Sequence, residues 1–286
     1  VFVGDRAPSH VIHAKQMRPK LPTAYKYDCV NSDVIINSLS VESGKLKLPN
    51  GVTYNALSLQ RNDVINLETL RGIHKLSQQG ALIVGKKPQK LGGYVVTEEM
   101  QKEFETLINE IWSRKTTYSK GEWEQIFKEN NIQKDLIIKG QPDFNFYHRR
   151  TEKEDIYFVY NHNLTESETL NCSFLVQGKV PELWNAETGE ITKLVEYTTK
   201  NGRTHISLEM HPQESVFVVF KEAEAVLPRV TYNPSEDVYK PAFSLDKKNN
   251  LQAEVFENGI YKSDINDAGK WYFEVNDIPN TIEING

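Results

Sequence analysis

The sequence predicts a multidomain chain in which an α/β part is followed by all-β structure. Its 286 residues exceed the usual length of one small domain and favour two or three domains. Apolar stripes with the helical period stop before Pro142, and alternating strand-like residues begin at Asp155. This change of period predicts a division into residues 1–143, 144–222 and 223–286.

Residues 1–143 alternate strand and helix patterns, which is typical of an α/β layered domain. The strand-like run 54–59 leads to a helix that Asn66 can cap, with apolar residues at every third position from Leu67. Gly80 stands where a left-handed residue ends a helix, and the buried run 81–85 follows at once. A strand, a helix and a strand with tight joints predict a βαβ unit with parallel pairing.

Further elements of this part carry their own signals. The turn at 49–51, Pro-Asn-Gly, lies between two apolar-rich runs and predicts a hairpin. Thr97 can cap a second helix, because two glutamates follow it at the positive helix end. Ser119 and Glu122 have the spacing of a capping box, which predicts that a third helix begins there. Residues 1–4 could form a short strand.

Residues 144–222 read as an antiparallel β-sandwich. Turn residues recur at intervals of roughly ten, which is the spacing of such a fold. Asn201-Gly202 is a strong hairpin turn, and residues 187–189 predict another. The predicted strands are 155–161, 170–176, a run around 183–184, 190–197, 204–210 and 215–220.

The last part, residues 223–286, contains the strand-like pieces 258–265 and 270–278. Residues 221–230 read as a linker before it. The remaining stretch is thin for an independent core, since domains of about 60 residues are already marginal. We therefore expect this part to be an incomplete β-domain. The first residue is not Met, which also leads us to expect a piece of a longer chain.

Charge and composition exclude two classes of partner. Lys and Arg number 7 and Asp and Glu 12 in residues 221–286, so residues 1–220 carry 34 − 7 = 27 against 39 − 12 = 27. A nucleic-acid binder needs a basic excess, because phosphate neutralisation dominates its affinity. No apolar run approaches the roughly 20 residues of a membrane span. We expect neither a nucleic-acid nor a membrane partner.

Motifs for catalysis, metals and cofactors are missing. Cys29 and Cys172 form no CxxC pair, and neither has the small flanking residues of a nucleophile elbow. The glycine pair 92–93 lacks the spacing of a phosphate-binding loop. His10 and His13 could bind a metal, although solvated loop histidines are the simpler interpretation. The sequence predicts no catalytic residue, no metal site and no cofactor.

The run His148-Arg149-Arg150 allows two interpretations. Three basic side chains between aromatic runs suggest a phosphate grip or part of an active site. The balanced charge of residues 1–220 favours a structural role at a domain junction just before the first sandwich strand. In that role the arginines pair with carboxylates at positions 152, 154 or 155, or with a facing domain, and His148 packs at the junction.

The order of several segments resembles the C-terminal half of the family 106 glycoside hydrolases, the α-L-rhamnosidase family. PELWNAETGEI, residues 181–191, is the sharpest of them. The resemblance is collinear over about residues 20–220, and its segments are AYKYDCVNSDVI, GKLKLPNGVTYNALSL, GALIVGKKP, PDFNFYHRRTEKEDIYFVYN, GKVPELWNAETGEITKL and SVFVVF.

The resemblance implies a fold and a role. It implies a degenerate amidotransferase-like (flavodoxin-like) α/β domain, a β-sandwich and a partial galactose-binding-like β-sandwich segment. Catalytic carboxylates in the family lie on an N-terminal (β/α)8 barrel, and such a barrel needs about 250 residues of its own. The chain is then a non-catalytic accessory fragment whose partner is the barrel of the same parent, a glycosidase of plant or bacterial polysaccharides. It also implies secretion or a periplasmic location in bacteria.

The alternative is a self-sufficient carbohydrate-binding module. Such modules place exposed aromatic rings against sugar faces, and the candidates are Trp184, Trp271 and Tyr272. The competing interpretation is that Trp184 belongs to the core and that residues 271–273 form an ordinary alternating strand. One residue of the run His148-Arg149-Arg150 could also reach sugar hydroxyls at the rim of the barrel, a task that suits the planar guanidinium of an arginine.

Overall fold

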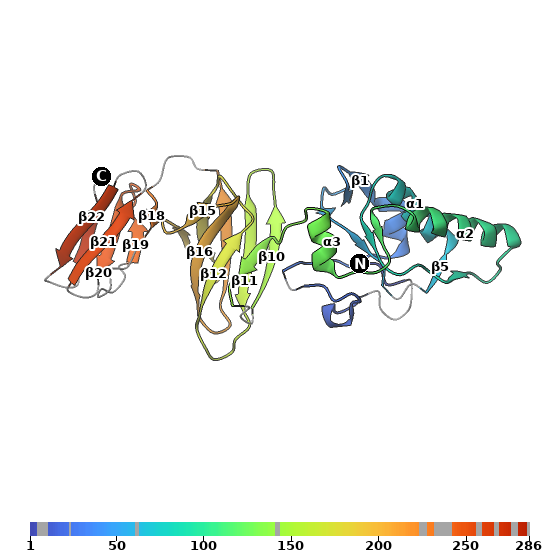
Figure 1. The fold of residues 1–286 in the computed structure, drawn as a ribbon. Coiled ribbons are helices and arrows are strands. Elements are labelled where there is room, and N and C mark those ends of the chain that lie inside the picture. Colours follow the sequence, from blue (N-terminus) through green and yellow to red (C-terminus); the bar gives the residue numbers. More distant parts are fainter. Residues whose placement is uncertain are drawn as a thin grey trace. The chain divides into compact units, whose positions relative to one another are not determined.

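The computed structural model is rich in β-structure, with several sheets and three α-helices among the residues it describes (Figure 1). These residues are 1–4, 11–22, 24–60, 63–140, 144–222, 228–231, 242–255, 259–265, 269–275 and 280–284, and from 259 onward the description covers the backbone. The chain forms two compact units, Val1–Gln133 and Lys134–Gly286. The finer division into three parts stays a prediction.

The N-terminal unit combines short sheets with all three helices. Two sheets are parallel, β4-β6-β8 and β5-β7, and one is antiparallel, β1-β2-β3. The elements are η1 (Ala14–Gln16), η2 (Val34–Ser38), β1 (Ser40–Glu42), β2 (Lys45–Lys47), β3 (Thr53–Tyr54), β4 (Leu57–Ser58), β5 (Val64–Asn66), α1 (Leu67–Gln78), β6 (Ile83–Val84), β7 (Lys90–Gly92), α2 (Glu98–Trp112), β8 (Thr117–Tyr118) and α3 (Trp123–Glu129).

The predicted βαβ unit is confirmed. Strands β4 and β6 pair in parallel, and α1 connects them. The Asn66 side chain accepts a hydrogen bond from the Thr69 backbone N–H at 2.8 Å, which caps the helix. Gly80 has a φ of 91°, the left-handed value expected just after a helix end. Leu70 and Ile73 of α1 are fully buried in the core of this unit.

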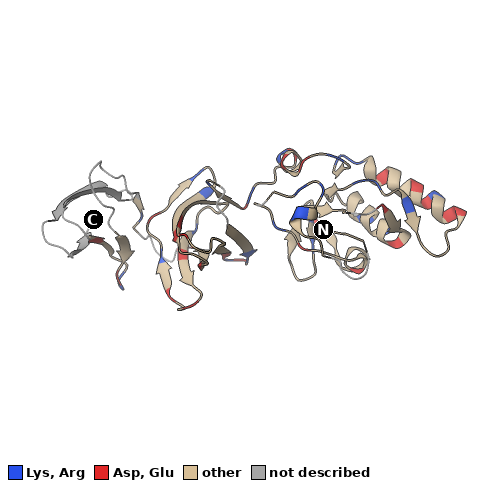
Figure 2. Ribbon diagram, turned by 90° about the horizontal axis from the view of Figure 1, so that it is seen from below, with Lys and Arg blue, Asp and Glu red and all other residues tan. Residues whose placement is uncertain are grey.

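The predicted hairpin and the second helix are also confirmed. Strands β2 and β3 pair across the turn at Gly51, whose φ is 88°. Thr97 caps α2 by accepting from the Met100 N–H at 3.2 Å, and the apolar stripe of α2 is buried at Phe104 and Ile111. Acidic residues recur along α2, as Figure 2 shows. The expected strand at residues 1–4 is reduced to two parallel bridges of Phe2, one to Val30 and one to Leu59.

The predicted start of the third helix is wrong. Helix α3 begins at Trp123, and its N-cap, Glu122, makes no side-chain capping bond. Gly121 has a φ of 120°, far from the helical value, so the chain cannot be helical from Ser119 onward. Since α2 with its 15 residues is the longest helix, no helix among the described residues could cross a membrane.

The C-terminal unit begins with two antiparallel sheets around a shared core. The five-stranded sheet has the order β10-β11-β17-β13-β14, and the four-stranded sheet has the order β15-β16-β12-β9. Their strands are β9 (Leu136–Ile138), β10 (Phe144–Arg150), β11 (Asp155–Asn161), β12 (Glu168–Phe174), β13 (Val180–Asn185), β14 (Ile191–Lys193), β15 (Thr198–Lys200), β16 (Arg203–Met210) and β17 (Ser215–Lys221).

Most of the predicted sandwich strands are confirmed, with one correction. Of the predicted strand 190–197, only β14 (Ile191–Lys193) is a strand, and the next strand, β15, begins at Thr198 and belongs to the other sheet. The hairpin at Asn201-Gly202 is confirmed, and both residues have a positive φ, 53° and 74°, as a type I′ turn requires. Three strands of these sheets, β9, β10 and β15, are additions that the sequence analysis did not predict.

The remaining strands form two three-stranded sheets, β18-β21-β22 and β19-β20-β23. Val230 and Leu251 pack with Val195 of the preceding segment in a small apolar cluster. Of the predicted linker 221–230, residues 223–227 lie outside the described residues, while Lys221 ends β17. The strands are β18 (Val230–Thr231), β19 (Ala242–Leu245), β20 (Leu251–Val255), β21 (Gly259–Ile265), β22 (Gly269–Val275) and β23 (Asn280–Ile284).

Candidate functional site

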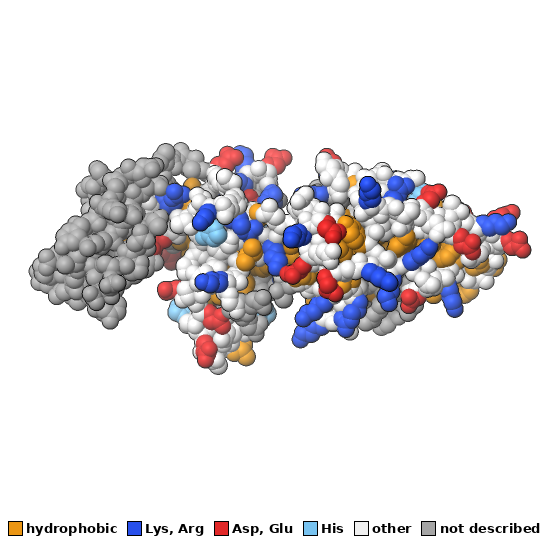
Figure 3. Space-filling model, in the orientation of Figure 1, with side chains coloured by type: hydrophobic (Ala, Val, Ile, Leu, Met, Phe, Trp, Pro, Cys, Tyr) orange, Lys and Arg blue, Asp and Glu red, His pale blue; other side chains and the backbone are white. Residues whose placement is uncertain are grey.

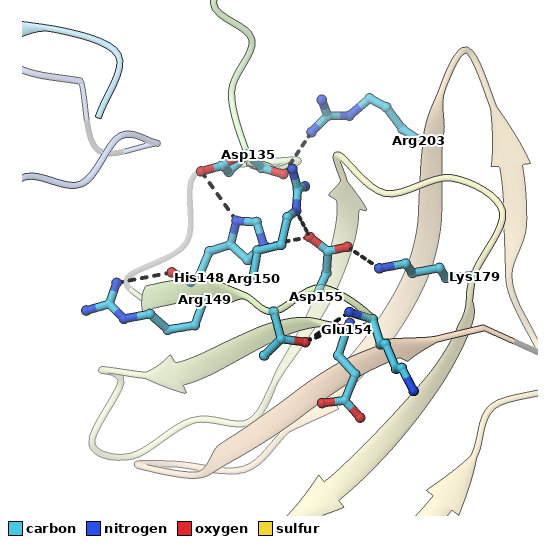
Figure 4. Close-up of polar contacts among 10 residues, drawn as sticks. Asp135, His148, Arg149, Arg150, Glu154, Asp155, Lys179 and Arg203 are labelled. Carbon is cyan, nitrogen blue, oxygen red and sulfur yellow. Dashed lines mark hydrogen bonds and ion pairs between the residues drawn. The ribbon is translucent and has the colours of Figure 1, made fainter. Parts of the chain in front are cut away.

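The run His148-Arg149-Arg150 is the end of strand β10 and does not precede the sandwich as a junction segment. Strand side chains alternate between the faces of a sheet. His148 and Arg150 therefore point inward, opposite Tyr157 and Asp155 of β11, whereas Arg149 points to the outer face (Figure 4). The expected position before the first strand is wrong because Phe144–Arg150 pairs along its full length with β11.

Asp155 is the centre of a group of ionic contacts on the inward side. Its carboxylate is 5% exposed. One oxygen, Oδ1, lies 3.0 Å from His148 Nε2 and accepts from Arg150 Nε at 2.5 Å. The other oxygen accepts from Lys179 Nζ at 2.9 Å (Figure 4). Three cationic or titratable groups, two from β10 and one from the segment before β13, thus converge on one buried carboxylate. The predicted pairing of Arg150 with position 155 is confirmed.

A second carboxylate and a tyrosine complete the surroundings of His148. Its Nδ1 atom lies 3.6 Å from Asp135 Oδ2. Its ring stacks on the Tyr157 ring at a centroid distance of 4.0 Å and an interplanar angle of 5°. Arg203 donates to the Asp135 backbone carbonyl at 3.3 Å and to the Ser173 carbonyl at 2.6 Å. The Tyr157 hydroxyl is buried and has no hydrogen-bond partner among the described residues.

These contacts set the protonation states of the group. Burial opposes charge on the His148 ring, but the carboxylates of Asp135 and Asp155 outweigh it and raise the pKa of His148. Burial would raise the pKa of Asp155, yet the bonds from His148, Lys179 and Arg150 hold that pKa well below its ordinary value. Burial raises the pKa of Tyr157. The arrangement is a buried anion held by cations.

This group is poorly suited to acid–base catalysis. A general acid must hold a proton near the working pH, and the low pKa of Asp155 keeps its carboxylate ionised. Burial raises the pKa of the Cys172 thiol to about 12, so it is not a nucleophile. Among the residues that the structure describes, no three His, Cys, Asp or Glu side chains could hold a metal ion.

Arg149 differs from its neighbours. Its guanidinium donates to the His148 backbone carbonyl at 3.2 Å, and within the described ranges it makes no ion pair. The expected pairing of Arg149 with a carboxylate at 152, 154 or 155 is therefore wrong, because β-strand alternation turns its side chain away from Asp155. Its position on the outer face leaves its charge in solvent.

Trp184 lies on the outer face of the five-stranded sheet and is half-buried, so the interpretation as a core residue is wrong. Its Nε1–H donates to Glu182 at 2.8 Å, and the Lys221 ammonium lies 4.6 Å from the ring centroid. Trp271 and Tyr272 belong to β22, and their side chains lie outside the described part of the chain. Their role in sugar binding stays a prediction.

The sequence analysis did not predict one feature of this face, a row of aromatic side chains. Tyr147, Phe158, Phe217 and Trp184 are register neighbours on four adjacent strands and form one aromatic row. The signal was present in the alternation of FNFYHRR, residues 144–150, but the strand it predicts was not recognised. Because β10 was not predicted, the position of Tyr147 beside Phe158 could not be predicted either.

The charged groups that meet in the N-terminal unit lie nearer the surface: Arg71 pairs with Glu103 at 2.7 Å, and His74 Nε2 lies 2.6 Å from Glu110. A small, mainly apolar cavity of about 100 Å³ is lined by Met17, Tyr25, Trp123 and Phe127, among others. Cys29 is half-buried and packs against the apolar cluster that contains Met17, Trp123 and Phe127, so it is not exposed on a turn. Both signs of charge occur on the face of this unit shown in Figure 3. His13 is exposed, and His10 lies outside the described residues.

Comparison with known proteins defines the class. The sequence model of glycoside hydrolase family 106, described as alpha-L-rhamnosidase, matches residues 1–199. The chain therefore belongs to the family 106 glycoside hydrolases, as its segment order predicted.

Two relatives sharpen this assignment. A protein of Formosa agariphila named "Putative beta-glucuronidase" is 33% identical over 226 residues, which are 78% of this chain and 19% of that protein. The structure of a rhamnosidase from Novosphingobium sp. PP1Y matches with a TM-score of 0.67 and 25% identity, over 85% of this chain and 23% of that one. The chain spans about one fifth of the length of these relatives.

Proposed function

We propose that this chain is a non-catalytic accessory region of a larger α-L-rhamnosidase-like glycosidase that acts on plant or bacterial polysaccharides. The state of Asp155 carries the proposal, because the buried carboxylate at the centre of the polar group is held as an anion by His148, Arg150 and Lys179. Glycoside hydrolysis needs one carboxylic acid that keeps its proton and one carboxylate. The catalytic pair would lie on a (β/α)8 barrel of the same parent.

Two further expectations belong to this proposal. An amidotransferase-like, flavodoxin-like N-terminal domain is supported by the order of parallel neighbours, since Phe2 bridges both Val30 and Leu59, and β6 and β8 follow beyond β4. The half-buried Cys29 suits a degenerate version without a nucleophile elbow. Export to the periplasm or the exterior of a bacterium follows from the family alone.

An activity assay tests the proposal. The chain is incubated with an aryl α-L-rhamnoside and, in view of the name of its relative, with an aryl β-glucuronide. We expect no release of the aryl alcohol above that of buffer, while a full-length rhamnosidase of the family serves as the positive control. Turnover that a point substitution within these 286 residues abolishes would contradict an accessory role.

Carbohydrate binding is a second candidate, and one observation favours it. Trp184 is on the outer face of its sheet with aromatic neighbours and does not fill the core. Calorimetric titration with neutral and acidic oligosaccharides tests this function, and the absence of heat at millimolar concentrations would remove it. His148 and Arg150 are poor sugar contacts in comparison, because both are engaged with Asp155.

A further inference from the structure

The outer face of the five-stranded sheet carries a row with one side chain from every strand. In register order the row runs Tyr147, Phe158, Phe217, Trp184 and Ile191. Adjacent strands are 4.7–4.9 Å apart, so the row is about 19 Å long. The terminal members, Tyr147 and Ile191, are 53% and 54% exposed, and the three between them are half-buried.

The rings of the row form one narrow surface. The Phe158 and Phe217 centroids are 5.1 Å apart, and their planes are tilted by 53°. A row one ring wide is too small for a protein partner, since a stable interface buries about 800 Å² on each side. It suits a linear ligand whose units each present an apolar face, and the C–H faces of pyranose rings have this property.

Charge on one side of the row indicates the kind of sugar. The next register row has charged residues at its ends and apolar ones between them, and it runs Arg149, Ile156, Val219, Glu182 and Lys193. Lys221 lies one row beyond it. Lys221 pairs with Glu182 at 3.1 Å, which neutralises the acid of this border. Arg149 and Lys193 remain at its two ends, and Lys193 also donates to Asn249 at 3.1 Å.

The opposite border is neutral. Its register row consists of Asn145, Tyr160 and Ser215, which offer amide and hydroxyl groups for hydrogen bonds with sugar hydroxyls. Residues 144–222 carry 8 Lys and Arg against 12 Asp and Glu, so a basic border on this face is a local departure from its surroundings. An anionic ligand would be attracted to one edge of the row and oriented by it.

We propose that this face binds a linear oligosaccharide that contains uronic acids. The pyranose rings lie along the aromatic row, and their carboxylates point to the basic border. Arg149 can bind a carboxylate through two parallel N–H donors, which a lysine cannot. The inference rests on the carbohydrate-binding candidate above and adds the chemical class of the ligand and the residues that select it.

The test compares two ligands that differ at one position of each unit. The chain is titrated calorimetrically with a β-1,4-linked tetraglucuronate and with its neutral counterpart cellotetraose. We expect the acidic ligand to bind about tenfold more tightly, as a charge-assisted hydrogen bond implies. Its affinity falls at high salt, because the basic border is exposed to solvent.

Three variants locate the site. Tyr147→Ala should weaken both ligands, because it removes an exposed stacking ring. Arg149→Ala should weaken the tetraglucuronate by about tenfold and leave cellotetraose unchanged, because it removes the bidentate contact. Lys200→Ala, on strand β15 of the other sheet, is the matched control and should change neither affinity. Circular dichroism and thermal melts verify that each variant is folded.

The outcomes distinguish carbohydrate binding by this face from its selection of uronic acids. Equal affinity for both ligands overturns the selection of uronic acids but keeps carbohydrate binding. No heat from either ligand overturns both carbohydrate binding and the selection of uronic acids. Self-association of the chain that Tyr147→Ala abolishes also overturns both, because the row would then be a protein interface. Tetraglucuronate binding that Tyr147→Ala and Arg149→Ala leave intact places the sugar elsewhere and overturns the assignment to this face.

Discussion

The two faces of the strand pair β10 and β11 use their side chains in opposite ways. On the inward face, His148 and Arg150 converge on the buried carboxylate of Asp155, so opposite charges compensate one another. On the outward face, Tyr147 and Arg149 extend into solvent. Consecutive residues of one strand therefore lie in two environments, and a run of three basic residues does not make one basic surface.

This difference separates stability from recognition. A buried ion must keep its partners, because desolvation costs several kcal/mol for each uncompensated charge. Asp155 keeps three partners, and these contacts join β11 to β10 and to the start of β13 within the five-stranded sheet. The rings of the outward face are only partly buried, and a partly exposed apolar surface of this kind can take part in ligand binding. Substitutions on the two faces should therefore have different consequences.

The largest expected effect is that of Asp155→Ala. The variant leaves His148, Arg150 and Lys179 without the carboxylate that compensates them. Breaking a buried ion pair from one side costs about 3 kcal/mol in free energy of unfolding. Urea denaturation at neutral pH measures this loss. Glu209→Ala, an exposed acid on β16, is the matched control. A loss from Asp155→Ala no larger than that from the control would show that the group is not stabilising.

Local signals were sufficient for much of the fold. Asn66 and Gly80 mark the two ends of α1 through a capping bond and a left-handed conformation, and both need only neighbouring residues. Asn201-Gly202 fixes a hairpin in the same way. The prediction from the capping box at Ser119 was wrong, because Gly121 has a positive φ and the helix cannot begin before it.

The strand Phe144–Arg150 could not be predicted from its composition. Its last residues are basic, and basic residues on the inward face of a sheet are costly unless a buried partner awaits them. That partner, Asp155, is five positions later, and only the pairing register places it opposite Arg150. Closeness in sequence therefore offered Asp155 as one of three carboxylates for Arg150, and the strand register selects it.

The rest of the site depends on long-range register. Asp135 and Lys179 reach the group from separate segments, and no local pattern relates them to His148. The aromatic row draws each residue from a different strand, so it exists only once the order β10-β11-β17-β13-β14 is known. Sequence analysis named Trp184 as a candidate but could not place it on the outer face.

A smaller effect is expected from pH. The folded pKa of His148 is raised above its ordinary value of 6.5, so its contribution to stability is fully present below pH 6.5. The contribution is lost as the pH rises through the folded pKa. Asp155 stays ionised throughout, because its pKa is lowered. The groups that face the ring are Asp135, Asp155, Arg150 and Tyr157.

Unfolding free energies across neutral pH check this prediction. The wild-type chain should lose stability on the alkaline side of pH 6.5, and His148→Gln should lack that part of the slope. His205→Gln, on β16 of the other sheet, is the control and should retain it. Identical pH profiles for the wild-type chain and His148→Gln would mean that the imidazole is not coupled to folding.

The smallest effects should come from the two neighbouring arginines, and they test the comparison most directly. Arg150 pairs with Asp155 but is 59% exposed, so solvent screening limits the loss from Arg150→Ala to about 1 kcal/mol. Arg149→Ala should change the free energy of unfolding by less than about 0.5 kcal/mol, because its side chain lies on the outer face. Parallel urea titrations at low and high salt measure both. The two variants remove the same group from adjacent positions, so composition cannot explain a difference between them. Equal losses would mean that alternation does not separate their environments.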